Sequence, residues 1–152
     1  MIPADVRQRL NQAHAVGNYA PLLALIPYAG LIGIECERQG EQLLFRLPAS
    51  ADNVGNPLLP AIHGGVIAGF MELSAALYLL VYSESTSIPK IIDFSIDYLR
   101  AGYLRDTYAS CQLWRQGRRV TNVAISAWQD DRNLPIAMAR AHFKIEPETP
   151  LK

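Results

Sequence analysis

The segment IHGGVIAGFMELSAALYLLV, residues 62–81, contains the residues whose types and spacing are suited to chemistry. The segment is apolar almost throughout, yet Glu72 lies in its middle, and no other Asp, Glu, Lys, Arg or His occurs between His63 and Glu84. A carboxylate in a buried apolar helix costs free energy unless a partner or a task compensates for it. Glu72 is therefore the first candidate for a catalytic group.

Two glycines, Gly64 and Gly65, are expected to begin the helix. A helix N-terminus offers unpaired amide N–H groups and a positive dipole end, which suit a carbonyl oxygen that gains negative charge. Glycine also lets a substrate approach the backbone closely, although a tight turn against a sheet would favour the same residues. His63, just before them, is expected to cap the helix or brace the loop rather than to transfer a proton.

Gly65 and Glu72 lie on one face of this helix, but about 10 Å apart along its axis by the ~1.5 Å rise per residue. One helix therefore cannot easily bring both groups to a single carbonyl. A twofold dimer with two such helices antiparallel would place Glu72 of one chain beside Gly65 of the other. The alternative is that Glu72 forms an ion pair with Arg100 or Arg140, or lies on a solvated face. Small residues near Glu72 predict a cavity for a medium apolar or aromatic group: Ala68, Gly69, Ala75 and Ala76.

The segments around the helix predict what positions it. Short helices are expected at residues 5–16 and 19–26, strands at 31–40 and 41–49, and a Gly-, Pro- and Asn-rich loop at 49–61. The segments that follow have strand composition and are separated by turn signals: 88–102, 103–117, 118–131 and 134–146. This order favours an α+β fold in which an antiparallel sheet of about six strands wraps around one long central helix, with short N-terminal helices.

The strand segment IIDFSIDYLRAG, residues 91–102, is long, apolar and rich in residues that favour strands. At the edge of a sheet such a segment promotes association unless it is already paired. We therefore predict that it pairs with its symmetry mate, which gives a homodimer or a dimer of dimers.

Length, composition and charge limit the class of protein. The 152 residues, half of them apolar, predict one domain over 1–152, with a helical segment at 1–27 and a core at about 28–146. Lys plus Arg and Asp plus Glu are both 14, so no surface for nucleic acid is expected. Cys36 and Cys111 predict free thiols and a reducing, cytoplasmic location, and no metal site is expected.

Neither a signal peptide nor a membrane span is expected from the sequence. Residues 1–23 carry charged and polar residues where a signal peptide would be apolar. The apolar run at 62–81 contains Glu72 and Ser74, and only about 17 residues follow its first glycines, whereas a span needs about 20.

The motif HGGVIAGFMELSA, an asparagine in the loop before it and the strand IIDFSIDYLRAG resemble, in that order, the hotdog-fold acyl-CoA thioesterases, and within them the phenylacetyl-CoA thioesterase-like (PaaI-like) group. The similarity covers about residues 28–146. It implies a hotdog fold, hydrolysis of an acyl-CoA thioester to a free acid and coenzyme A, no separate cofactor, and sites at the subunit interface. The alternatives are a non-catalytic acyl-CoA binding or sensing protein and a hotdog hydratase or dehydratase.

The resemblance also implies roles for individual residues. The Gly65 amide would polarise the thioester carbonyl, and Glu72 would act as a general base or as a nucleophile. Asn56, or else Asn53, would orient the attacking water or the thioester. The expected site residues are Glu72, Gly65, Asn56 and His63 for catalysis and Gly64, Asn53, Ala68, Arg118 and Arg119 for substrate binding, the two arginines at the phosphates of coenzyme A.

Overall fold

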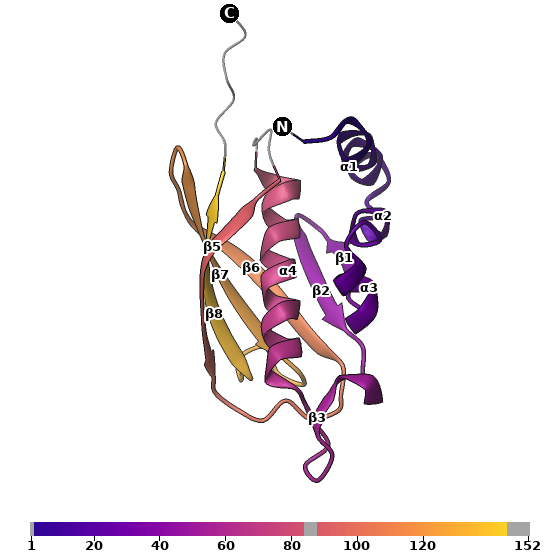
Figure 1. Cartoon of the computed structure of the whole chain (residues 1–152), viewed down its shortest axis with the longest axis vertical. Helices are drawn as coiled ribbons and strands as arrows, with labels where there is room; N and C mark the ends of the chain where they lie inside the picture. The colour runs from indigo at the N-terminus through magenta and orange to yellow at the C-terminus, as the bar shows by residue number, and fades with distance from the viewer. Residues whose placement is uncertain (1, 84–87, 146–152) are drawn as a thin grey trace, which may run out of the picture.

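A computed structural model describes residues 2–83 and 88–145 of the chain, in which one long helix lies against a curved sheet (Figure 1). The helices are α1 (Ala4–Val16), α2 (Ala20–Leu23), α3 (Pro27–Ile32), the short 3-10 helix η1 (Ala51–Asn53) and α4 (Gly64–Tyr82). The strands are β1 (Glu35–Gln39), β2 (Gln42–Leu47), β3 (Val54–Asn56), β4 (Ala61–Ile62), β5 (Lys90–Tyr98), β6 (Thr107–Gln116), β7 (Val120–Trp128) and β8 (Ala137–Lys144).

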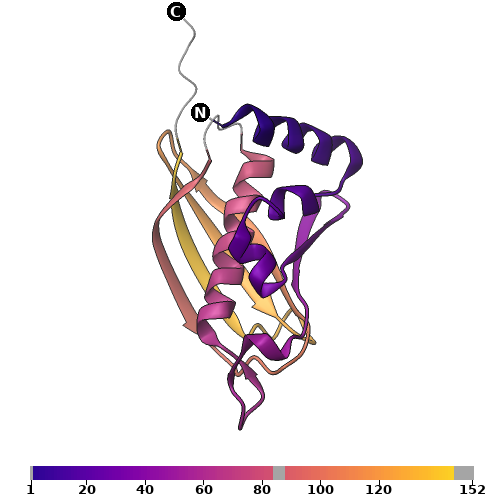
Figure 2. The same ribbon diagram turned by 45° about the vertical axis from the view of Figure 1, so that its right-hand side comes forward.

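The main sheet has six strands in the order β1-β2-β6-β7-β8-β5, and every neighbouring pair is antiparallel. A small second sheet joins β3 to β4. Figures 1 and 2 place α1, α2 and α3 along one side of α4, beside β1, whereas β5 lies on its other side. The predicted α+β hotdog architecture, with six strands around one long helix, is confirmed.

The sheet-facing side of α4 is closely packed. Phe70 and Met71 have no accessible surface and share one core cluster with Val123 and Ile125 of β7. Each such side chain contributes about 1.5–3 kcal/mol when it is fully buried. Three of the four inward residues of β8 are alanines, which leave room for the helix, and the fourth is Phe143: Ala137, Ala139, Ala141 and Phe143. By length and composition α4 could cross a membrane, but in this fold it is the core helix.

The N-terminal region differs from the prediction. The sequence suggested a helix at 19–26 that stops before Pro27 and a strand from residue 31, but Pro27 is the first residue of α3 and β1 starts only at Glu35. Proline is well suited to the first helical position, because its fixed φ fits and its missing N–H is not needed there. Gly33, with φ 82°, ends α3 in the left-handed conformation.

The loop before α4 is joined to α3 by one buried asparagine. Asn53 is 5% exposed, and its Nδ2 donates to the Ile32 carbonyl oxygen at 2.9 Å. The Asn53 carbonyl in turn accepts a hydrogen bond from the His63 amide at 2.8 Å. Asn53 therefore fixes the end of α3 and the start of α4 relative to each other.

Strand β5 is an edge strand, as the sequence predicted. It pairs with β8 from Lys90↔Lys144 to Tyr98↔Ala137, and its other side has no partner among the described residues. Ile92 is 57% exposed and Tyr98 53%. This edge is therefore open to a second chain.

We expect Asn53→Ala to lower the free energy of unfolding by about 1–3 kcal/mol, because the buried Ile32 carbonyl would lose its donor. Urea denaturation measures the change. Asn56→Ala is the control, since Asn56 is exposed and its side chain accepts only the Leu58 amide within its own turn. Equal costs for the two variants would contradict the role assigned to Asn53.

Candidate active site

The start of α4 is capped by a histidine side chain. His63 occupies the N-cap position, and its Nδ1 accepts a hydrogen bond from the Gly65 amide at 2.9 Å. The ring nitrogen must be unprotonated to accept it, so the proton of the neutral ring is on Nε2. His63 thus caps the helix, as expected, but it does so by engaging the amide that the sequence assigned to the thioester carbonyl.

Gly64 has a different environment from Gly65. Its carbonyl accepts a hydrogen bond from the Tyr98 hydroxyl at 2.6 Å, which ties the start of α4 to the edge strand β5. No acceptor for the Gly64 amide is present in residues 2–83 and 88–145. A Cβ at residue 64 would lie 3.2 Å from the Tyr98 hydroxyl oxygen, so this close approach favours glycine.

Glu72 is half-buried and has no counter-ion in the described part of the chain. Burial raises the pKa of its carboxyl above the ordinary value of 4.5, and no nearby charge or hydrogen bond offsets the effect. Arg100, one of the partners considered from the sequence, instead donates to the Pro135 carbonyl at 2.7 Å. The ion-pair interpretation of Glu72 therefore has no support in this geometry.

The face of α4 that carries Gly65 and Glu72 points away from the sheet and is partly covered by α3. Ring atoms and the hydroxyl of Tyr28 lie 2.6 and 2.7 Å from the place where a Cβ of Gly69 would be. Ala75 is completely buried. The Tyr28 ring therefore occupies part of the space that the small residues were predicted to leave open.

The two candidate loop asparagines do different things. Asn53 is used within the fold, as described above, whereas Asn56 is exposed and its Oδ1 accepts the Leu58 amide at 3.0 Å in a turn. Neither side chain is hydrogen-bonded to Glu72 or His63. Between them, Gly55 lies so close to His63 that a Cβ would be 2.7 Å from the His63 Cα atom, a constraint that sequence reasoning missed.

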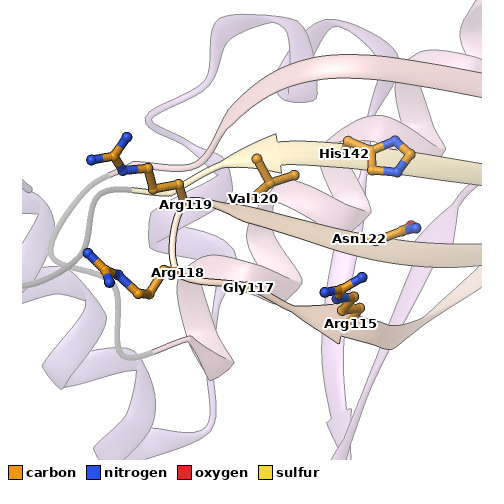
Figure 3. Close-up of a pocket in the computed structure, with 7 residues that line it drawn as sticks. All are labelled: Arg115, Gly117, Arg118, Arg119, Val120, Asn122 and His142. Atoms are coloured by element: carbon orange, nitrogen blue, oxygen red, sulfur yellow. The ribbon is translucent and has the colours of Figure 1, made fainter.

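Arg118 and Arg119 lie at the turn between β6 and β7, beside a hollow of about 560 Å³ that Arg115, Asn122 and His142 also line (Figure 3). The outward-facing residues Asn122 and His142 place this hollow on the sheet face opposite α4. His142 Nδ1 is 3.0 Å from Asp93 Oδ2.

The strand register puts this turn far from the start of α4. Val120 and Lys90 both pair with Lys144 at one end of the sheet, whereas Tyr98, which contacts Gly64, pairs with Ala137 at the other end. Within one chain, the fold therefore does not bring Arg118 and Arg119 to Gly64, Gly65 or Glu72.

The two cysteines are free, and neither lies in a reactive setting. Burial raises the pKa of the Cys36 thiol to about 12 and that of Cys111 further still, so both remain protonated and weakly nucleophilic. No cluster of three or more His, Cys, Asp or Glu residues suited to a metal occurs in the described ranges.

Comparisons with known proteins identify the family. Residues 59–136 match the model of the thioesterase superfamily. The medium/long-chain acyl-CoA thioesterase YigI of Escherichia coli K12 is 30% identical over an alignment of 136 residues, which covers 79% of this chain and 86% of YigI. The chain belongs to the thioesterase superfamily, and the thioester hydrolase expected from the sequence is confirmed at the level of the family.

Solved structures agree with this assignment. A protein of Chromobacterium violaceum is 42% identical, with a TM-score of 0.73 and coverage of 95% of this chain and 99% of that one. A phenylacetic acid degradation-related protein of Ralstonia eutropha has the same fold at 20% identity, with a TM-score of 0.71 and coverage of 83% and 98%. The resemblance to hotdog thioesterases that the motif suggested is confirmed.

The raised pKa of Glu72 predicts a pH-dependent stability. The folded chain holds this proton to a higher pH than the unfolded chain, so ionisation of Glu72 costs stability as the pH rises past its ordinary pKa. Glu72→Gln removes that cost. We expect the difference in Tm between Glu72→Gln and the wild type to grow from about pH 4 to about pH 7. Melting curves over this range measure it, and a constant difference would contradict the desolvation of Glu72.

Proposed function

We propose that this chain hydrolyses acyl-CoA thioesters to a free acid and coenzyme A, at a site shared by two subunits. The observation that carries the proposal is Glu72, a desolvated carboxylate without a counter-ion in the described residues, on the open face of α4 and two turns from a glycine-rich helix start. Such a carboxyl group is suited to proton transfer or to attack on carbon. The named activity of YigI supports acyl-CoA as the substrate class.

The start of α4 supplies the group that polarises the carbonyl. The Gly65 amide, our first choice from the sequence, donates to the His63 ring, so it serves the thioester only where the ring releases or shares it. The Gly64 amide has no such competitor among the described residues. Both amides lie at the positive end of the helix dipole, and His63 controls which of them is available.

Glu72 completes the reaction in one of two ways. As a general base it takes a proton from water, the hydroxide adds to the carbonyl carbon, and the C–S bond breaks to release the thiolate of coenzyme A. As a nucleophile its oxygen attacks the carbonyl, the thiolate leaves, and water cleaves the resulting anhydride. Single turnover in ¹⁸O-labelled water tests for the second route, because label enters the Glu72 carboxyl group only when water cleaves an anhydride at the Glu72 carbonyl carbon.

A twofold dimer through β5 brings the two halves of the site together. In such a dimer the two α4 helices run antiparallel. Gly65 of one chain lies at the same height as Glu72 of the other only if the twofold axis passes beside Ala68 and Gly69, midway between the two positions. The small side chain of Ala68 leaves room for the helices to approach, which gives Ala68 its role in the site, whereas the Tyr28 ring occupies the space above Gly69. Antiparallel pairing also brings the β6–β7 turn of one subunit to the end where α4 of the other begins.

This arrangement gives Arg118 and Arg119 their proposed place. The arginines of one subunit would contact the phosphates of a coenzyme A whose thioester lies at the helix start of the other subunit. We also propose a cytoplasmic location, because the free thiols of Cys36 and Cys111 favour a reducing compartment.

A non-catalytic acyl-CoA binding protein is the second candidate, because the engaged Gly65 amide is compatible with binding without hydrolysis. No feature of the described residues favours a hydratase or dehydratase over either. Release of free thiol from a panel of acyl-CoAs separates the first two functions, since a binding protein gives saturable binding without product.

We expect Glu72→Gln to lower turnover by at least about 100-fold, the lower end of what a positioned acid or base contributes. The Tm at pH 7 should be unchanged or higher, because the variant removes a desolvated charge. Glu41→Gln makes the same chemical change on a side chain that is 96% exposed and should keep full activity. Full activity in Glu72→Gln, or a large loss of stability, would rule out the catalytic role.

The shared site also predicts an oligomer. Light scattering at micromolar concentration should give two or four times the chain mass of 16.8 kDa. Ile92→Lys places a charge on the exposed edge of β5 and should shift the protein toward the monomer, with loss of turnover. A monomeric wild type, or an active monomeric variant, would remove the basis for a site built from two chains.

A further inference from the structure

Tyr28, on α3, takes the place of the side chain that Gly69 lacks. The carbon Cε1 and the hydroxyl oxygen of Tyr28 lie 2.6 and 2.7 Å from the ideal Cβ position of Gly69, closer than a real Cβ allows. Tyr28 comes from a segment 41 positions earlier in the chain, so this contact belongs to the tertiary fold. The absence of a side chain at Gly69 therefore lets the Tyr28 ring lie directly against the helix.

The contact lies between two groups that serve the two composite sites of the proposed dimer. Gly65 is four residues before Gly69 and Glu72 is three residues after it, so both are its nearest neighbours on the same helix face, with about 5–6 Å between Cβ positions. In the proposed dimer, the Gly65 site is completed by Glu72 of the partner subunit. An acyl group that runs from this site along α4 toward Gly69 would therefore meet the Tyr28 ring.

The ring is accessible and yet firmly placed. Tyr28 is 41% exposed, and its hydroxyl has no hydrogen-bond partner in the described part of the chain. The helix that carries it is anchored by the buried residues Ala29 and Ile32 and by the bond from Asn53 to the Ile32 carbonyl. An exposed aromatic surface on an anchored helix is suited to contact with an apolar ligand.

We propose that Tyr28 is a specificity-determining residue of the thioesterase site, whose ring forms the wall that limits the length of the acyl group lying along α4. The inference rests on the proposed function, because it assigns the acyl group to the strip beside Gly69. Removing the ring opens the space above Gly69 and favours longer acyl chains.

The test compares hydrolysis of butyryl-, octanoyl- and palmitoyl-CoA by Tyr28→Ala and the wild type. The ratio of kcat/KM for palmitoyl-CoA to that for butyryl-CoA should rise by roughly tenfold or more, since a few methylene groups in an apolar pocket carry that much discrimination. Both kcat/KM values come from the same preparation of a variant, so a loss of active protein cancels from their ratio. Tyr28→Phe keeps the ring and should keep the ratio, and Leu31→Ala, at a 77% exposed position of the same helix, is the matched surface control.

A stability measurement tests the contact without substrate. Gly69→Ala should raise Tm more in the Tyr28→Ala background than in the wild type, because the added methyl group meets the ring only when the ring is present. If Tyr28→Ala does not fold, Tyr28→Leu shortens the side chain and serves in both experiments.

The outcomes separate this inference from the proposed function. A wild type that hydrolyses none of the acyl-CoAs refutes the proposed function, and the specificity role fails with it. An active wild type whose chain-length ratio stays within twofold in a folded Tyr28→Ala variant refutes the inference alone. Additive effects of Gly69→Ala and Tyr28→Ala on Tm would likewise refute it.

Discussion

The first turn of α4 is held by hydrogen bonds that come from three separate parts of the chain. The Asn53 carbonyl fixes the His63 backbone, the His63 ring accepts the Gly65 amide, and the Tyr98 hydroxyl binds the Gly64 carbonyl. A helix N-terminus leaves its first amides unsatisfied, so what surrounds it decides which of them can serve a ligand. Here the Gly65 amide is used within the fold, because it donates to the His63 ring. The Gly64 amide has no acceptor in the described part of the chain.

The raised pKa of Glu72 follows from the way α4 packs on the sheet. Because α4 packs its apolar side on β6, β7 and β8, Glu72 has to emerge on the opposite face, where α3 covers it only in part. Partial burial without a counter-ion raises the pKa of its carboxyl. The same packing that stabilises the helix therefore prepares the carboxyl group for proton transfer, at a modest cost in stability above its ordinary pKa.

Local patterns in the sequence were sufficient for most of the fold. The apolar run with its glycine start predicted α4, and alternation with turn signals predicted β5 to β8, because both signals arise from residues close together in the chain. Helix α3 was missed because Pro27 and Gly30 resemble helix breakers, although a proline is favoured at a first helical position. Its importance depends on a contact with Gly69 that no local pattern reveals.

The residues of the candidate site could be predicted from the sequence, but their hydrogen bonds and their positions relative to one another could not. The HGG motif and the spaced acid identified His63, Gly65 and Glu72, yet the hydrogen bond that engages the Gly65 amide depends on the conformation of one ring. The positions of Arg118 and Arg119 depend on strand register, which places them at the far end of the opposite sheet face. Register and side-chain rotamers are properties of the assembled fold, so composition and spacing could not supply them.

The N-terminal helices lie outside the part of the chain that defines the family. Residues 59–136, which match the family model, include α4 and three of the six strands of the main sheet, whereas Tyr28 and the rest of α3 lie before that range. The proposed determinant of acyl-chain length therefore belongs to a segment that the family model does not include. This segment also belongs to the core, since Leu22, Ala29 and Ile32 are buried in it, and both the Asn18–Glu37 bridge and the bond from Asn53 to Ile32 tie it to the rest of the chain. An exchange of residues 1–34 between relatives would therefore have to preserve this packing and both connections.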